Sequence, residues 1–164
     1  DYETGIETYC FNREVEWKNA RDEDKIELRG RILGGCIDNL INLVGTKFDN
    51  VKHFIEKYKN DKIIWFFDNC ELTSEGILRG LWQLKQAGWF ENTNGFIFGR
   101  KKKKKSCYDV SFEEAVMEVL EELTVQVIFQ AYIGHFPPQM TIINGAIASI
   151  VSQNGKGKIK FIKI

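Results

Sequence analysis

The segment KIIWFF (Lys62–Phe67) is a continuous apolar run, and it ends directly at a carboxylate, Asp68. An apolar run of this length without polar alternation predicts a strand that is buried on both faces. The shorter run GFIFG (Gly95–Gly99) has the same character. Segments with helix signals follow both runs, so the sequence predicts an α/β domain that is built on buried strands.

Helix-start signals mark three segments around these runs. The middle segment carries apolar residues at helical spacing, which we expect to face the core, and Gly88 is expected to end it. Those apolar residues are Ile77, Leu78, Leu81, Trp82 and Leu84. We expect Asp49 or Asn50 to cap a helix over Val51–Tyr58, and Thr73 or Ser74 to cap a helix that runs to about Ala87. Ser111 and Glu114 are expected to form a capping box for a helix that runs to about Leu123.

The segment GRILGGCIDNLINLVGT (residues 30–46) predicts a short strand, a turn at Gly34 and Gly35, and a short helix that ends near Gly45. The C-terminal third is rich in expected strands, and the last of them alternates Lys with Ile or Phe, which predicts a half-exposed strand. A mixed sheet follows, without a simple alternating doubly wound order. The strands expected there are Val125–Phe129, Met140–Ile143, Ala146–Val151 and Lys158–Ile164.

Residues 1–28 are polar and charged, with Tyr9, Phe11, Val15 and Trp17 alternating. This pattern predicts an edge strand or a linker that folds back. The chain begins at Asp1, so it is expected to be a fragment. We interpret residues 1–28 as a linker or edge strand that follows a missing N-terminal domain, and residues 29–164 as one domain.

The composition excludes several classes of function. A chain of 164 residues with a hydrophobic fraction of 43% can form a real core, and Lys plus Arg equal Asp plus Glu at 23 each. A neutral chain gives no global reason to expect nucleic acid as a partner. No apolar run approaches the roughly 20 residues that span a bilayer, so we expect no membrane partner. We expect a cytoplasmic protein.

The cysteines predict reduced thiols. Cys10, Cys36, Cys70 and Cys107 are far apart and form no CxxC pair, which is usual in cytosolic proteins. A metal hydrolase would need about three convergent ligands, which these cysteines and two histidines do not predict. We expect no metal and no cofactor.

His135 is the main candidate for chemistry, in the segment YIGHFPPQ (Tyr132–Gln139). Histidine changes its charge readily near neutral pH, and two following prolines stiffen the backbone. Gly134 allows backbone or substrate to approach closely. The alternative is a buried histidine that bonds a backbone carbonyl. We expect His53, on a helix, to lie at the surface or to pack.

Asp68 is the candidate carboxylate, because it follows a buried strand, and sites gather at that edge of open sheets. A carboxylate there can accept the Nδ1 proton of a histidine and fix its tautomer. Asp68 is equally well explained as a turn residue. Glu71, on the same loop, is a weaker candidate. Lys101–Lys105 is the single block of like charge, and a solvated loop is its simplest interpretation.

Five blocks taken together resemble the C-terminal domain of the LD-carboxypeptidases, a serine peptidase family that also contains the microcin C self-immunity protein. The resemblance covers about residues 30–164, and the order and spacing of the blocks make it specific. The blocks are residues 30–46, residues 62–90, GFIFGR (95–100), VSFEEA (110–115) and IGHFPPQMTIINGAIA (133–148).

The resemblance implies a swivelling β/β/α fold and a Ser-His-Glu triad that cleaves the amide bond between an L-residue and a D-residue. It assigns His135 to the catalytic histidine and places the serine in a separate N-terminal domain. The family glutamate matches Asp68 or, in a stricter alignment, Phe67. Phe67 cannot orient a histidine, so the role passes to Asp68, whose side chain is one methylene shorter.

The resemblance therefore implies a hydrolase that supplies His135 and Asp68 from this chain. Ser74, Ser106, Ser111, Ser149 and Ser152 lack the context of a nucleophile elbow, and helix capping better explains Ser74 and Ser111. The expected partners are the chain's own N-terminal domain, a murein-type peptide as substrate and, as in relatives, a second copy in a homodimer. The alternative is a binding module that kept the fold and lost catalysis.

Overall fold

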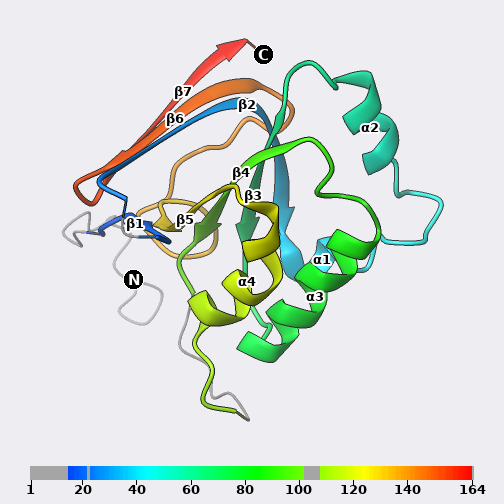
Figure 1. Ribbon diagram of the computed structural model, residues 1–164, viewed down its shortest axis with the longest axis horizontal. Helices are drawn as coiled ribbons and strands as arrows, with labels where there is room; N and C mark the ends of the chain where they lie inside the picture. The colour runs from blue at the N-terminus through cyan, green and yellow to red at the C-terminus, as the bar shows by residue number, and fades with distance from the viewer. Residues whose placement is uncertain (1–14, 22, 102–107, 164) are drawn as a thin grey trace, which may run out of the picture.

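The chain folds around one mixed sheet, with helices on one side of it (Figure 1). The computed structural model describes residues 15–21, 23–101 and 108–163. Within these residues the sheet has seven strands in the order β1-β5-β4-β3-β2-β6-β7. They are β1 (Lys18–Asn19), β2 (Lys25–Cys36), β3 (Ile63–Asp68), β4 (Thr93–Gly99), β5 (Gln126–Ala131), β6 (Ile147–Gln153) and β7 (Lys156–Lys163).

The centre of the sheet is parallel, and its edges are antiparallel. The pairs β2–β3, β3–β4 and β4–β5 are parallel, whereas β1–β5, β2–β6 and β6–β7 are antiparallel. In Figure 1, β6 and β7 arch away from the helices together with the first half of β2, so the sheet curls. The predicted α/β class with a mixed sheet and a β-rich C-terminal third is confirmed.

The β3 strand is apolar throughout because both of its faces are buried. Ile63, Trp65 and Phe67 face the helices in one core cluster, with Trp65 and Phe67 stacked at 5.6 Å between ring centroids. Ile64 and Phe66 face the opposite cluster, inside the curl of the sheet.

Three helices begin and end close to where the local sequence predicts, whereas the first ends at Leu40, before the expected end near Gly45. The Thr73 side chain accepts a hydrogen bond from the amide of Gly76, at 3.3 Å, and Ser111 with Glu114 forms a complete capping box. Gly88 follows α3 with φ of +79°, the conformation that stops a helix. The helices are α1 (Ile37–Leu40), α2 (Val51–Lys57), α3 (Ser74–Gln86) and α4 (Phe112–Leu120), with a 3₁₀ turn, η1 (Glu121–Leu123), after α4.

Three expectations about local structure are wrong. Gly34 and Gly35 do not form a turn but continue β2. Position 34 requires glycine because a Cβ there would overlap the backbone of Phe66 on the neighbouring strand. Residues 140–143 form no strand; they pass over the sheet in a loop, where Met140 and Ile142 pack on the inner cluster. Trp82 is 57% exposed and does not belong to the buried face of α3.

The described N-terminal residues join the sheet through a short edge strand. Residues 18–19 form the edge strand β1, and Trp17 beside it is buried in the inner cluster. The sheet already begins its long second strand at Lys25, four residues before the expected domain start at residue 29. Tyr9 and Phe11 lie outside the described residues.

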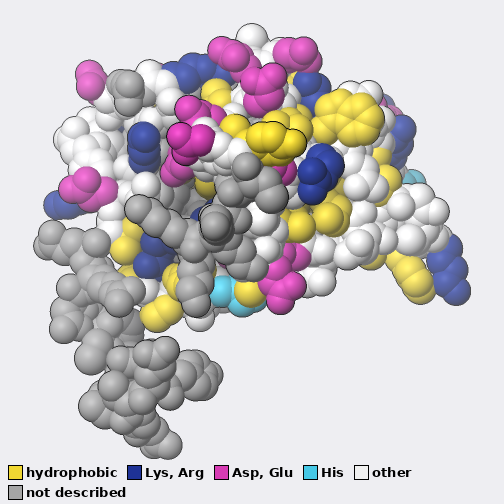
Figure 2. Space-filling model, turned by 90° about the horizontal axis from the view of Figure 1, so that it is seen from below, with side chains coloured by type: hydrophobic (Ala, Val, Ile, Leu, Met, Phe, Trp, Pro, Cys, Tyr) yellow, Lys and Arg dark blue, Asp and Glu magenta, His cyan; other side chains and the backbone are white. Residues whose placement is uncertain are grey.

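The surface shows charges of both signs. Figure 2 views the molecule from below the orientation of Figure 1, and on that face acidic and basic side chains are interspersed with hydrophobic ones. Among the described residues no helix has both the length and the apolar character that crossing a membrane requires.

Candidate active site

Asp68 lies at the carboxyl end of β3, on the inner face of the curled sheet. Side chains alternate along a strand, so Asp68 points to the same side as Ile64 and Phe66. Its residue is 5% exposed. A buried carboxylate is stable only where donors or cations satisfy it, so its partners define the chemistry of this site.

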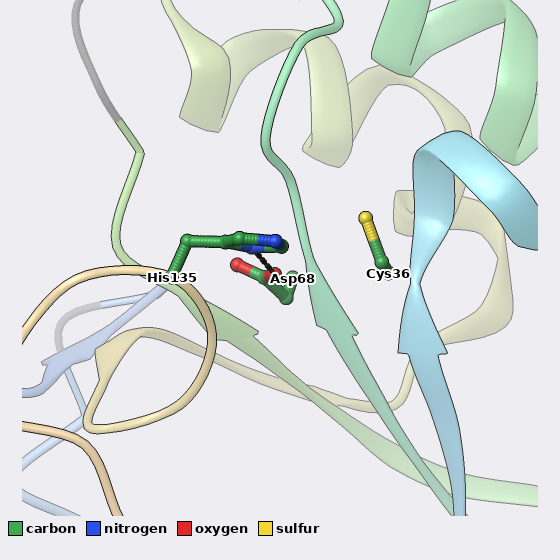
Figure 3. Close-up of side chains that lie close together, drawn as sticks. All are labelled: Cys36, Asp68 and His135. Atoms are coloured by element: carbon green, nitrogen blue, oxygen red, sulfur yellow. Dashed lines mark hydrogen bonds and ion pairs between the residues drawn. The ribbon is translucent and has the colours of Figure 1, made fainter.

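His135 is the partner of Asp68. The His135 Nδ1 donates a hydrogen bond to Oδ2 of Asp68, and 49% of the His135 side chain is exposed (Figure 3). With Nδ1 as the donor, the neutral ring has Nε2 as its acceptor. The structure therefore brings together the two side chains that the sequence analysis selected, and it leaves one ring nitrogen able to take a proton.

Gly134 makes this contact sterically possible. Its φ is +95°, and a Cβ at this position would overlap the Asp68 carboxylate. Only glycine combines that backbone conformation with such a close approach. The glycine before His135 is therefore explained by packing against Asp68.

Arg100 holds the loop that carries His135. Arg100 directly follows β4, and its guanidinium donates to the carbonyl oxygens of three consecutive residues, Phe136, Pro137 and Pro138. The bond to Pro137 is 2.9 Å. The peptide bond between the two prolines is cis. The sequence analysis missed this role, because the contact joins residues that are 36 to 38 positions apart.

Cys36 lies close to Asp68 and His135, and the sequence analysis did not select it as a site residue. It ends β2 and lies opposite Asp68 in the parallel register. Its Sγ donates to Asp38 Oδ2 at 3.3 Å. Burial, followed by the hydrogen bond to Asp38 and the charge of that carboxylate, raises the pKa of the Cys36 thiol to about 11. No local signal in the sequence marks this position, because the parallel register of β2 and β3 brings Cys36 beside Asp68.

Asp38 organises the loop that follows Asp68. It accepts hydrogen bonds from the backbone amides of Cys70, Glu71 and Leu72, at 3.0, 2.7 and 3.0 Å. Burial acts to raise the pKa of Asp38, but these donors and Cys36 outweigh it and hold the pKa below its ordinary value. Asp38 is therefore an anionic cap for residues 70–72.

The other candidate residues lie elsewhere or act structurally. Glu71 is exposed, and its amide bonds Asp38, so burial favours Asp68 as the residue that orients His135. Phe67 is 1% exposed in the aromatic core on the opposite face of the sheet, which excludes it as a partner of His135. His53 is exposed on α2, as expected for a surface position.

The described serines have structural positions. Ser111 caps α4, and Ser152 donates to Asn19 at 2.6 Å. Thr73, and not Ser74, caps α3; Ser74 instead accepts from Lys101 at 3.5 Å. Ser149 lies within β6. Ser106 and residues 102–105 of the lysine block lie outside the described residues.

The fold and this cluster define a class: an α/β domain that presents a carboxylate–histidine pair where parallel strands end. A family model for the LD-carboxypeptidase C-terminal domain matches residues 29–150. The chain therefore belongs to the LD-carboxypeptidase C-terminal domain family. Among curated proteins, none matches the chain.

Solved structures have the same fold. The muramoyltetrapeptide carboxypeptidase from Oxalobacter formigenes is 19% identical, with a TM-score of 0.66 over 89% of this chain and 49% of its own length. An MccF-like protein from Bacillus anthracis str. Ames is 25% identical, with a TM-score of 0.66 over 90% of this chain and 43% of its own. The microcin C7 self immunity protein MccF is 18% identical, with a TM-score of 0.67 over 94% and 42%. The chain thus spans less than half the length of these proteins.

Proposed function

We propose that this chain is the C-terminal part of a serine L,D-carboxypeptidase-like hydrolase. In this proposal the substrate is a murein tetrapeptide or a related peptide, cleaved between an L-residue and a D-residue. His135 is the base, Asp68 orients it, and the nucleophilic serine lies on an N-terminal domain. The hydrogen bond between Asp68 and His135 in a member of this family is the observation that carries the proposal.

The geometry suits this chemistry. Nε2 of His135 accepts the serine proton as the hydroxyl oxygen attacks the amide carbon, and it then donates that proton to the leaving amine. Asp68 Oδ2 holds Nδ1 and stabilises the imidazolium that forms. Water then hydrolyses the acyl-enzyme with the same base. The half-exposed ring allows a second domain to bring its hydroxyl to Nε2.

A large separation between Asp68 and His135 would favour the alternative of an inactive binding module. They are in contact, so this alternative loses its geometric support. The Asp68 side chain is one methylene shorter than the family's Glu, and it nevertheless reaches His135, with Gly134 packed against its carboxylate. The proposed partners are the N-terminal domain, the peptide substrate and a second copy in a homodimer.

The test measures D-alanine release from an L,D-tetrapeptide by the chain joined to the sequence that precedes it. We expect His135→Ala to lower kcat by roughly 10⁴-fold or more, and Asp68→Asn by about 10²- to 10⁴-fold. An L,L-tetrapeptide is the substrate control. The 164-residue chain alone is expected to be inactive.

Two matched variants separate catalysis from folding. His53→Ala removes the other histidine, and Glu71→Gln removes the alternative carboxylate; both are expected to keep activity. Full turnover in His135→Ala would refute the proposed base. Hydrolysis by the chain alone would refute the split site.

A further inference from the structure

Three potential metal ligands meet at the ends of neighbouring strands, a convergence that the sequence analysis did not expect. Cys36 and Asp68 are paired opposite each other on β2 and β3, and His135 lies over them on its loop (Figure 3). One donor atom from each side chain, a sulfur, a carboxylate oxygen and a ring nitrogen, lies within 4.8 Å of the other two.

One oxygen of this cluster lacks a partner. Oδ2 of Asp68 accepts from His135, whereas Oδ1 is buried and has no hydrogen-bond partner among the described residues. A buried carboxylate oxygen without a donor is costly, by about 1 to 3 kcal/mol or more when charged. The whole residue is 5% exposed, so this oxygen is shielded from bulk solvent. This oxygen lies against Gly134, and a cation bound by Asp68, Cys36 and His135 would neutralise the carboxylate that carries it.

We propose that Cys36, Asp68 and His135 form a binding site for a thiophilic divalent cation of the zinc class. Sulfur, imidazole nitrogen and carboxylate oxygen are the donors that Zn²⁺ prefers, whereas Mg²⁺ and Ca²⁺ select oxygen. Three protein ligands leave a fourth coordination position open, and the half-exposed His135 side chain places the site near solvent. This inference does not depend on the proposed hydrolase function.

The distances require only a small closure. Zinc lies about 2.0 to 2.3 Å from such ligands, so tetrahedral donors are roughly 3.2 to 3.6 Å apart. The widest present separation, up to 4.8 Å, therefore shortens by about 1 Å or slightly more, whereas the hydrogen bond between His135 and Asp68 opens to admit the ion. The half-exposed His135 side chain has the freedom to make this movement, while the buried Asp68 stays fixed.

The charge balance is favourable. Binding replaces the thiol proton, so M²⁺ and Cys36–SH give the metal thiolate and one H⁺, which goes to solvent. The thiolate and the Asp68 carboxylate then neutralise the ion. Asp38, whose oxygens already accept backbone amides, stays in place as a neighbour that fixes the end of β2.

The cation would also compete with the proposed catalysis. A ring nitrogen that binds a metal has no lone pair with which to accept a serine proton, so the metal-bound form of a His135-dependent hydrolase would be inactive. Binding and activity are separate measurements. The site is therefore testable even if the proposed hydrolysis is wrong.

The experiment titrates the purified chain with Co²⁺ and Zn²⁺. We expect one ion per chain by elemental analysis after gel filtration, a near-ultraviolet cobalt–thiolate absorption band, and displacement of Co²⁺ by Zn²⁺. Cys36→Ser, Asp68→Ala and His135→Ala are each expected to weaken binding at least about tenfold. Cys70→Ser and His53→Ala are the matched thiol and imidazole controls, and they should bind as the parent does.

A variant with serine at Cys10, Cys70 and Cys107 retains Cys36 as its only thiol. The thiolate band should persist in this variant. Absence of the band there, unchanged affinity in Cys36→Ser, or failure to bind Zn²⁺ at all would each overturn the site. Circular dichroism of every variant identifies any that fail to fold, and the only-thiol variant keeps the test decisive because all three ligands remain.

Discussion

Replacing Gly134 by alanine tests the contact on which the site depends. The left-handed conformation, with φ of +95°, costs a non-glycine residue roughly 1 to 2 kcal/mol. The new methyl group would also overlap the buried Asp68 carboxylate, and overpacking of this kind typically adds about 1 to 3 kcal/mol. We therefore expect Gly134→Ala to lower the free energy of unfolding by about 2 to 5 kcal/mol.

Gly145 provides the matched control on the same loop. Its φ is +87°, and a Cβ there would meet no atom within 4 Å, so Gly145→Ala carries the conformational cost alone. Urea unfolding followed by circular dichroism gives both values. In the Asp68→Ala background, most of the extra cost of Gly134→Ala should disappear. Equal destabilisation by the two substitutions in the parent chain would refute the claimed contact between Gly134 and Asp68.

Four further results are expected. Arg100→Gln removes the hydrogen-bond donors to three loop carbonyls. We therefore expect faster amide hydrogen exchange around His135 and a loss of about 2 to 4 kcal/mol in the free energy of unfolding. Unchanged exchange would contradict the proposed role of Arg100 in holding the loop. The pKa of Asp38 is lowered on folding, so its stabilisation is present above the ordinary carboxyl value near about pH 4 and is lost as pH falls through the lowered pKa. Asp38→Asn should accordingly destabilise the chain at pH 7 but have little effect once the pH is below the lowered pKa, as measured by denaturant melts at pH 7 and through the acid range. With a pKa of about 11, Cys36 should react slowly with iodoacetamide at pH 8, and the rate should rise about tenfold per pH unit up to that pKa. Asp38→Asn should lower the pKa of Cys36 and so accelerate the reaction. Rapid alkylation at pH 7 would contradict the raised pKa. Leu81→Ala should cost about 2 to 5 kcal/mol, whereas Trp82→Ala should cost under roughly 1 kcal/mol, because only Leu81 is buried.

Local signals in the sequence predicted most of the elements because each signal acts within a few residues. The KIIWFF run, the cap at Thr73 and the capping box at Ser111 are of this kind, and all three appear in the structure. The Gly34–Gly35 pair was misread as a turn, since the reason for it is the backbone of Phe66, more than 30 positions away in the chain. At such positions the residue type is determined by contacts with the neighbouring strand and not by residues nearby in the sequence.

The difference between local signals and contacts between strands also explains which residues of the candidate site could be predicted from the sequence. Asp68 and His135 each carry a local signal, as polar groups near strand ends, and the family resemblance links the two. Cys36 was discounted because its separation from both residues in sequence gave no sign of proximity. The parallel register of β2 and β3 places it beside Asp68, and sequence spacing carries no information about that register.

The long strand β2 changes partners near Arg31. Its first half pairs with β6 from Lys25 to Arg31, and its second half pairs with β3 from Arg31 to Cys36. One strand therefore belongs both to the outer antiparallel part of the sheet and to the parallel part that carries Cys36. Because strand side chains alternate with a period of two, a one-residue slip at the ribbon end would turn Ile26 and Leu28 outward and would also carry Cys36 out of line with its neighbour. Burial of Ile26 and Leu28 in the antiparallel half of β2 thus helps to keep Cys36 aligned with Asp68. One residue inserted in that half would shift the position of Cys36 at the far end of the same strand.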